Sequence, residues 1–143
     1  MGDANGVYSD GCECRVDANP ATCAAAAPHM LTVGGTLSLT GNIVPTTSPD
    51  WFALSFAPDG HPRVHFTTNP GGHQLAVFES CASTTTGAVC MDRPSGATGV
   101  SDWEFFDGMD VVTRMTPAPT TVFVRVSNSG AVTCANYTLA VSN

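Results

Sequence analysis

The fold class is decided by Gly35-Thr36-Leu37-Ser38-Leu39-Thr40-Gly41 and by Asp50-Trp51-Phe52-Ala53-Leu54-Ser55-Phe56, two stretches in the first half of the chain. Two similar stretches lie near the end, Thr121-Val122-Phe123-Val124-Arg125-Val126 and Asn136-Tyr137-Thr138-Leu139-Ala140-Val141. In each, apolar residues alternate with polar or small ones at a period of two, which is typical of a half-buried strand. Gly, Pro, Asn or Ser residues bound each stretch. The pattern therefore predicts antiparallel strands of a β-sandwich.

The rest of the chain extends this pattern. We expect strands at 31–40, 50–57, 62–68, 74–79, 88–91, 110–115, 120–127 and 135–142. Turn sequences such as Pro58-Asp59-Gly60 and Asn69-Pro70-Gly71-Gly72 separate them. Short strands without a helical stretch indicate an all-β fold, an antiparallel β-sandwich or jelly roll of about eight strands. The predicted core is Leu37, Leu39, Phe52, Leu54, Phe56, Val64, Phe66, Leu75, Val77, Val122, Val124, Val126, Tyr137, Leu139 and Val141.

Two regions are expected. Residues 1–29 lack periodicity and contain three cysteines, so we interpret them as a disulfide-stapled N-terminal coil or short helix that packs on the domain. Residues 30–143 form the β-sandwich domain, and 143 residues are enough for one domain with a sizeable core. Because Met1-Gly2-Asp3 leads directly into polar sequence, we expect no signal peptide and interpret the chain as part of a larger secreted protein.

Charge narrows the range of partners. The chain has twelve acidic and five basic side chains, for a net charge of −7, and all the basic ones are arginines. Nucleic acid is excluded as a partner because phosphate binding needs a basic surface. Membrane insertion is also excluded, since no apolar run approaches the roughly 20 residues of a membrane span.

The cysteines indicate the compartment. The six are Cys12, Cys14, Cys23, Cys81, Cys90 and Cys134, an even number that predicts three disulfides in an extracellular or cell-surface protein. We predict that Cys81 pairs with Cys90 and closes a polar loop, which stabilises the fold by roughly 2–3 kcal/mol. Cys12 and Cys14 would then pair with Cys23 and Cys134. The alternative is a zinc site formed by Cys12, Cys14, Cys23 and a histidine.

The order of these segments resembles the bacterial pre-peptidase C-terminal domain. The matching motifs are Gly35-x-Leu-x-Leu-x-Gly41, Asp50-Trp51-Phe52-Ala53-Leu54, Leu75-Ala76-Val77-Phe78, Val122-Phe123-Val124-Arg125-Val126 and Asn136-Tyr137-Thr138-Leu139-Ala140-Val141. They cover roughly residues 34–142. The resemblance implies a jelly-roll sandwich attached to secreted hydrolases or surface proteins, with roles in secretion, substrate binding or spacing, and with calcium in some members. The Cys-rich first 29 residues and the acidic-aromatic segment near 95–110 depart from the family pattern.

The acidic-aromatic segment holds the main candidate site. Four carboxylates, Asp102, Glu104, Asp107 and Asp110, could supply the oxygen ligands that calcium prefers on an irregular loop. The alternative, which we favour, is a solvated loop. Its aromatic residues Trp103, Phe105 and Phe106 could form a platform for sugar rings or for a protein partner, or else close one end of the core.

Other oxygen-rich or imidazole-rich positions are weaker candidates. Asp3, Asn5 and Asp10 resemble a truncated calcium loop, although a flexible terminus is the simpler interpretation. His61, His65 and His73 could bind zinc or copper, but the alternation around His65 predicts that it faces solvent. Asp50 is interpreted as a strand-start cap or a structural hydrogen-bond acceptor rather than a catalytic acid.

The sequence contains no Gly-x-Ser-x-Gly elbow, no His-Glu-x-x-His motif and no Gly-rich phosphate loop. Glu79 or Glu104 could pair with an aspartate as in glycoside hydrolases, but nothing favours this. We therefore predict no enzyme activity and a secreted accessory module that binds extracellular polysaccharide or protein surfaces, with possible calcium support. The alternatives are a structural or secretion spacer of a larger secreted protein and a small jelly-roll hydrolase.

Overall fold

The computed structural model describes residues 14–78, 80–82, 102–104, 121–128 and 134–143. These residues form a short 3-10 helix, η1 (Cys23–Ala25), and the strands β1 (Pro28–Leu31), β2 (Thr36–Gly41), β3 (Asp50–Phe56), β4 (Arg63–Thr68), β5 (Gln74–Phe78), β6 (Asp102–Glu104), β7 (Thr121–Ser127) and β8 (Tyr137–Ser142). One sheet has the order β1-β3-β7-β5, and the other has the order β2-β8-β4-β6. Neighbouring strands are antiparallel except β1 and β3, which run parallel. Within this part of the chain, no helix is long and apolar enough to cross a bilayer.

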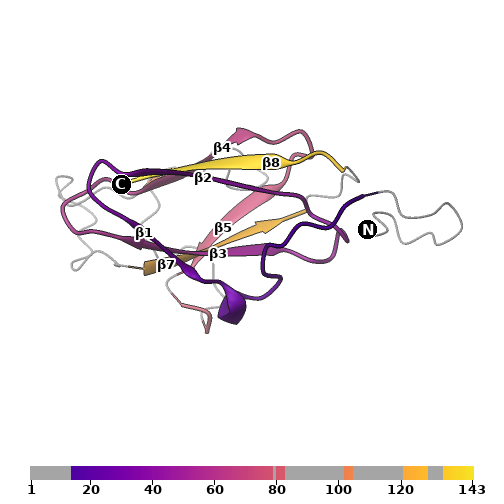
Figure 1. Ribbon diagram of the computed structural model, residues 1–143, viewed down its shortest axis with the longest axis horizontal. Coiled ribbons are helices and arrows are strands. Elements are labelled where there is room, and N and C mark those ends of the chain that lie inside the picture. The colour runs from indigo at the N-terminus through magenta and orange to yellow at the C-terminus, as the bar shows by residue number, and fades with distance from the viewer. Residues whose placement is uncertain (1–13, 79, 83–101, 105–120, 129–133) are drawn as a thin grey trace, which may run out of the picture.

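The two sheets lie face to face as two layers (Figure 1). Burial alternates along β7 and β8, so that one side of each strand faces the other sheet. One cluster of buried side chains fills the space between the layers: Leu31, Leu39, Ile43, Phe52, Leu54, Phe56, Val64, Leu75, Val77, Val122, Val124, Val126, Tyr137, Leu139 and Val141, with Leu37 and Phe66 partly buried against it. The predicted β-sandwich and its predicted core are therefore confirmed, and Leu31 and Ile43 join the core in addition.

The predicted strand 31–40 is wrong as a single element, because it is divided between two sheets. β1 begins at Pro28 and pairs with β3, whereas β2 pairs with β8. A tight turn separates them, in which the Gly35 amide donates to the Thr32 carbonyl over 2.8 Å. Gly34 has a φ of 74°, a conformation that glycine adopts without steric cost. The predicted strands 88–91 and 110–115 lie outside the described residues.

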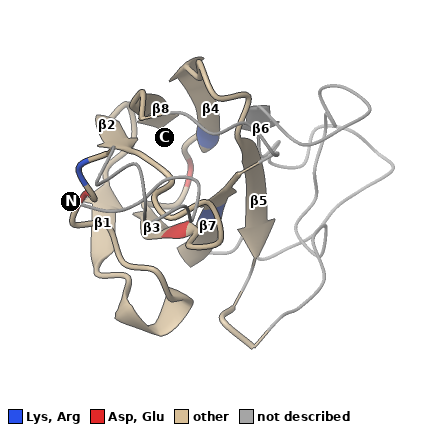
Figure 2. Ribbon diagram, turned by 90° about the vertical axis from the view of Figure 1, so that its right-hand side faces the viewer, with Lys and Arg blue, Asp and Glu red and all other residues tan. Residues whose placement is uncertain are grey.

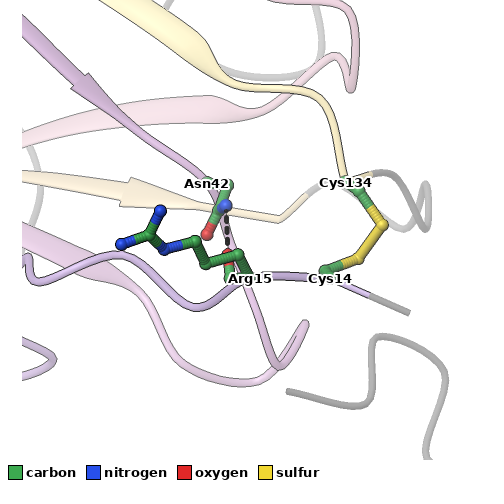
Figure 3. Close-up of a disulfide and its surroundings, with 4 residues drawn as sticks. All are labelled: Cys14, Arg15, Asn42 and Cys134. Atoms are coloured by element: carbon green, nitrogen blue, oxygen red, sulfur yellow. Dashed lines mark hydrogen bonds between the residues drawn. A yellow bond between two sulfur atoms is a disulfide. The ribbon is translucent and has the colours of Figure 1, made fainter. Parts of the chain in front are cut away.

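Two disulfides are present in the described chain, Cys14–Cys134 and Cys23–Cys81. Cys14–Cys134 is one of the predicted pairings (Figure 3). The predicted Cys81–Cys90 bridge is wrong, because η1 packs on β3 and lies within reach of the residues that follow β5. The pairing of Cys23 with Cys12 or Cys14 is wrong for the same reason, and Cys12 and Cys90 lie outside the described residues.

These bridges also decide between disulfides and zinc. The sulfur atoms of Cys14 and Cys23 are both bonded to other sulfurs, so neither can serve as a thiolate ligand. The zinc hypothesis for the N-terminal cysteines is therefore wrong. Disulfides persist in oxidising compartments, and the two bridges fit such a location.

Candidate functional site

An irregular segment connects the two disulfide anchors at the N-terminal end of the described chain. We call residues 15–22 the strap, because Cys14 and Cys23 fix its two ends to distant parts of the sandwich. In Figure 1 it is the indigo segment that leads to η1. The Asn42 side chain donates from Nδ2 to the Arg15 carbonyl over 2.7 Å (Figure 3), and the Trp51 amide donates to the Pro20 carbonyl over 2.9 Å. The strap is thus tied to the chain after β2 and to the start of β3.

The middle of the strap is held by a polar cluster composed of Asp17, Asn19, Asp50 and Tyr137. Asp17 accepts hydrogen bonds from the backbone amide of Asn19 (3.0 Å) and from the backbone amide of Asn42 (2.6 Å). The Asn19 Nδ2 atom lies 2.9 Å from Asp17 Oδ2 and 3.2 Å from Asp50 Oδ2. The Tyr137 hydroxyl donates to the same Asp50 oxygen. The side-chain amide of Asn19 therefore bridges the carboxyl groups of Asp17 and Asp50, which lie 33 residues apart in sequence.

Three strands end or begin at this cluster. Asp50 is the first residue of β3, Tyr137 is the first of β8, and Gly41, its ladder partner, is the last of β2. A Cβ atom on Gly41 would overlap the Asn19 amide, the Asp50 carboxyl and the Tyr137 hydroxyl. The cluster can form because this position has no side chain. Asp50 and Tyr137 are buried, with 5% and 0% of their surfaces exposed.

Burial shifts the titration of both groups. Desolvation raises the pKa of Asp50 to about 7; the Tyr137 hydrogen bond opposes this rise and the charge of Asp17 adds to it. Desolvation also raises the pKa of Tyr137, and the neighbouring Asp50 charge raises it further. A carboxyl with a pKa near 7 suits a general base. Here, however, its oxygen accepts hydrogen bonds from Tyr137 and Asn19, which confirms the prediction that Asp50 is a structural acceptor.

These shifts predict how stability depends on pH. Because the folded-state pKa of Asp50 is raised, its contribution is complete below pH 3.8 and is lost as the pH rises through 7. Burial lowers the pKa of His73, opposed by Asn128, so the contribution of His73 is present above pH 6.5 and is lost as the pH falls. Between pH 6 and pH 8 we expect the free energy of unfolding of wild type to fall by about 1.4 kcal/mol relative to that of Asp50→Asn, because Asp50 loses its proton near pH 7 and the opposing rise from His73 is common to both proteins. Denaturant titrations of wild type and of Asp50→Asn, which cannot ionise, test this: an equal slope in both proteins contradicts the assignment.

A groove runs along one side of the sandwich, where β1 and β2 are the edge strands of their two sheets. Figure 2 shows these strands on the same side of the molecule, without charged residues. Two hollows of about 400 and 410 Å³ lie there, and His29 lines both. We call them together the edge groove. Its lining comprises Ala18, Asn19, Pro20, Ala25, Ala27, Pro28, His29, Met30, Leu31, Thr32, Gly35, Thr36, Leu37, Ser38, Leu39, Thr40, Trp51 and Phe52.

Trp51, one of the residues that line the groove, has its ring packed on the β1-β3-β7-β5 sheet against Arg125 and Phe78. The Arg125 guanidinium lies 5.7 Å from the centre of the Trp51 ring and 5.2 Å from that of Phe78. The two rings are 5.4 Å apart. A cation that stands over two neighbouring aromatic rings attracts both of them. These contacts hold the Trp51 ring on the side of β7 and β5, while Trp51 is also among the residues that line the first hollow.

The acidic-aromatic segment lies only partly within the described residues. Asp102, Trp103 and Glu104 form β6, an extended strand paired with β4, so the prediction of an irregular loop is wrong for these three positions. The ladder aligns Trp103 with Val64. The remaining candidates Asp107, Asp110, Phe105 and Phe106 lie outside the described residues, as do Asp3, Asn5, Asp10 and Glu79.

The structure does not bring the histidines together with other ligands. His61 is exposed, His65 is half-buried on β4, and the buried His73 packs edge-on against Tyr137 with ring centres 5.9 Å apart. Among the described residues, no group of three or more His, Cys, Asp or Glu side chains could hold a metal ion. The three histidines therefore do not form such a group, and a zinc or copper site built on two imidazoles stays a prediction.

Sequence reasoning missed two members of the polar cluster, Asp17 and Asn19. The available signal was local: an aspartate two residues before an asparagine forms an Asx-type turn, here through the Asn19 amide and Asp17 Oδ1. Nothing in that motif indicates that the turn lies against Asp50 and Tyr137 in the folded chain.

No family model and no curated protein matches the chain. Among solved structures, the chain is similar to the pre-peptidase C-terminal domain of collagenase from Bacillus anthracis, with 10% sequence identity and a TM-score of 0.43. The match covers 82% of this chain and 94% of that domain. It names the same family that the order of segments in the sequence resembles.

Proposed function

We propose that this chain is a non-catalytic accessory module of a secreted protein and that it binds extracellular polysaccharide or protein surfaces through the edge groove. The observation that carries this proposal is the chemistry of the groove. Its lining combines apolar side chains with Asn19, His29, Ser38 and Thr40, and it includes no Lys, Arg, Asp or Glu. Ligand sites typically combine an apolar surface with a few polar groups that fix orientation.

An uncharged polysaccharide fits this surface best. The hydroxyl and amide groups of Ser38, Thr40 and Asn19 can exchange hydrogen bonds with sugar hydroxyls, since each both donates and accepts. Trp51 lines the same hollow and adds apolar surface next to them. A polyanion is disfavoured because the whole chain carries a net charge of −7.

An extended peptide from a protein surface is the second candidate. β1 and β2 each have a strand neighbour on one side within the described chain, and the groove lies between them. An open strand edge presents backbone donors and acceptors that an added strand can pair with. This observation favours a protein partner that contributes an extended segment.

Calcium support and the aromatic platform remain separate proposals. Calcium would bind at Asp102, Glu104, Asp107 and Asp110, and a ligand would contact Trp103, Phe105 and Phe106. Asp102 and Glu104 lie on β6, so two of the four carboxylates would come from a strand. Binding in calcium and in chelator tests the metal directly.

The decisive experiment measures retention of the protein on insoluble neutral polysaccharides and on matrix proteins. We expect Ser38→Trp to weaken binding about tenfold or more, because Ser38 is exposed on β2 and a large ring there fills the groove. Thr67→Trp is the matched control, since Thr67 is exposed on β4 of the same sheet and does not line the groove.

The outcomes separate the candidates. Normal retention of Ser38→Trp with loss of retention in Trp103→Ala would reject the groove and support the acidic-aromatic segment. Loss of retention in chelator alone would add calcium to the site. If wild type is retained on no polymer or protein, the structural or secretion spacer becomes the better proposal.

A further inference from the structure

The Asn19 amide is shared among more acceptors than it can serve. Its Nδ2 atom carries two hydrogens, yet it lies 2.9 Å from Asp17 Oδ2, 3.0 Å from the Thr40 carbonyl and 3.2 Å from Asp50 Oδ2. Tyr137 supplies one more hydrogen, to Asp50. The backbone amide of Asn42 also donates to Asp17 Oδ2 and Tyr137 to Asp50 Oδ2, so each of these carboxyl oxygens keeps a donor; if both groups are ionised, however, two negative charges flank one side-chain amide. A proton held between the two carboxyl groups removes this repulsion.

Among the residues that the structure describes, no cation is among the groups that act on Asp50. The titratable groups that act on Asp50 are Asp17 from the strap and Tyr137 from β8, and Asn19 is neutral. β2 contributes the Thr40 carbonyl and the bare backbone of Gly41. His73, which precedes β5, touches the Tyr137 ring, and burial lowers its pKa, so it is neutral above its ordinary pKa.

We propose that the strap is a pH-sensitive latch beside the edge groove: Asp17 and Asp50 share one proton next to the Asn19 amide, and loss of that proton loosens the strap from β2 and β3. The predicted direction agrees with the pKa of Asp50, which burial raises to about 7. Carboxyl groups this close cannot both ionise without cost, as in other acid pairs that share a proton.

The disulfides determine what the loosened strap can do. Cys14 and Cys23 hold its ends, so residues 15–22 can move outward but cannot leave the sandwich. Ala18, Asn19 and Pro20 form one wall of the first hollow of the groove. Outward movement of this wall changes the width of the groove. The consequence for ligand binding rests on the proposed function, whereas the movement of the strap does not.

Two backbone amides report the docking of the strap without any ligand. The Asn42 amide donates to Asp17, and the Trp51 amide donates to the Pro20 carbonyl. We expect their hydrogen-exchange protection, corrected for the intrinsic rate, to fall about tenfold or more between pH 6 and pH 8.5 in the oxidised, full-length protein. The Leu54 amide, in the centre of β3, is the internal reference and should stay protected.

Asp50→Asn is the test variant because an asparagine keeps the shape of the protonated acid and cannot ionise. It should keep the Asn42 and Trp51 amides protected at pH 8.5. Asp59→Asn is the matched control, since Asp59 is an exposed aspartate in the turn after β3, and it should behave as wild type. Protection that is independent of pH in wild type, or that falls equally in Asp50→Asn, overturns the latch. Should Asp50→Asn fail to fold, Asp17→Asn removes the other charge and must likewise abolish the pH dependence.

Binding measured over the same pH range separates the two proposals. If the strap loosens but no polymer or protein is retained at any pH, the latch stands and the proposed function fails. If a ligand is retained while both amides stay protected throughout, the proposed function stands and the latch fails.

Discussion

Replacing Cys14 and Cys134 together by alanine is expected to lower the free energy of unfolding by about 4–5 kcal/mol, a large part of the stability of a domain of this size. The bridge joins residues 120 positions apart, so its removal frees nearly the whole chain in the unfolded state. On the chain-entropy model, the stabilisation grows with the length of the closed loop. Cys14 is also buried, in contact with Val44, so its loss removes packing as well.

Cys23→Ala with Cys81→Ala is the matched comparison. That bridge spans 58 residues, and Cys81 is exposed, so the expected loss is smaller, about 4 kcal/mol from entropy alone. Denaturant unfolding of the two double variants and of wild type, with and without reductant, measures the difference. Wild type that unfolds at the same denaturant concentration in reductant would show that neither bridge contributes. A greater loss of unfolding free energy in the Cys23→Ala, Cys81→Ala variant would contradict the expectation that the longer loop and the burial of Cys14 make the Cys14–Cys134 bridge the more stabilising one.

The alternating strands were predictable from sequence because burial between two layers imposes a period of two. β7 and β8 follow that pattern, with Val122, Val124 and Val126 on one side of β7, and β3 departs from it only at Ala53, which is buried as well. The division between β1 and β2 was not predictable from this signal, since Leu31 and Leu37 both belong to apolar runs that flank the turn. A turn at Gly34 and Gly35 moves the chain from one sheet to the other without interrupting the apolar pattern.

The polar cluster and the Cys23–Cys81 bridge depend on contacts between elements that sequence patterns do not connect. Asp17 meets Asp50 only because the strap crosses the start of β3, and Tyr137 joins them because β8 pairs with β2. Similarly, η1 contacts β3, which lies in the same sheet as β5, the strand before Cys81. Local spacing favoured Cys81–Cys90, whereas the topology of the sheet determines the bridge. The sequence indicated one role in the cluster correctly, that of Asp50 as an acceptor.

Gly41→Ala is expected to lower the free energy of unfolding by about 2–4 kcal/mol, although it adds only a methyl group, because overpacking and a lost buried hydrogen bond each cost about 1–3 kcal/mol. The new Cβ atom would overlap the Asn19 amide, the Asp50 carboxyl and the Tyr137 hydroxyl. Asp50 and Tyr137 are buried and cannot move away without losing their mutual hydrogen bond. A buried acid that loses its partner is costly, and this cost exceeds the smaller gain from a less flexible unfolded chain.

Gly34→Ala is the matched control for this variant, because it separates crowding from backbone strain. Gly34 has open space around the position of a Cβ atom, but its φ of 74° is unfavourable for alanine, so a loss of about 1–2 kcal/mol is expected. Thermal and denaturant unfolding of both variants at pH 6 give the comparison. If Gly41→Ala costs no more than Gly34→Ala, the cluster tolerates displacement and does not hold the strap. If the free energy of unfolding of Gly41→Ala also does not change between pH 6 and pH 8, the new Cβ atom has separated Asp50 from Asp17. This is the result expected from the contact between position 41 and the Asp50 carboxyl.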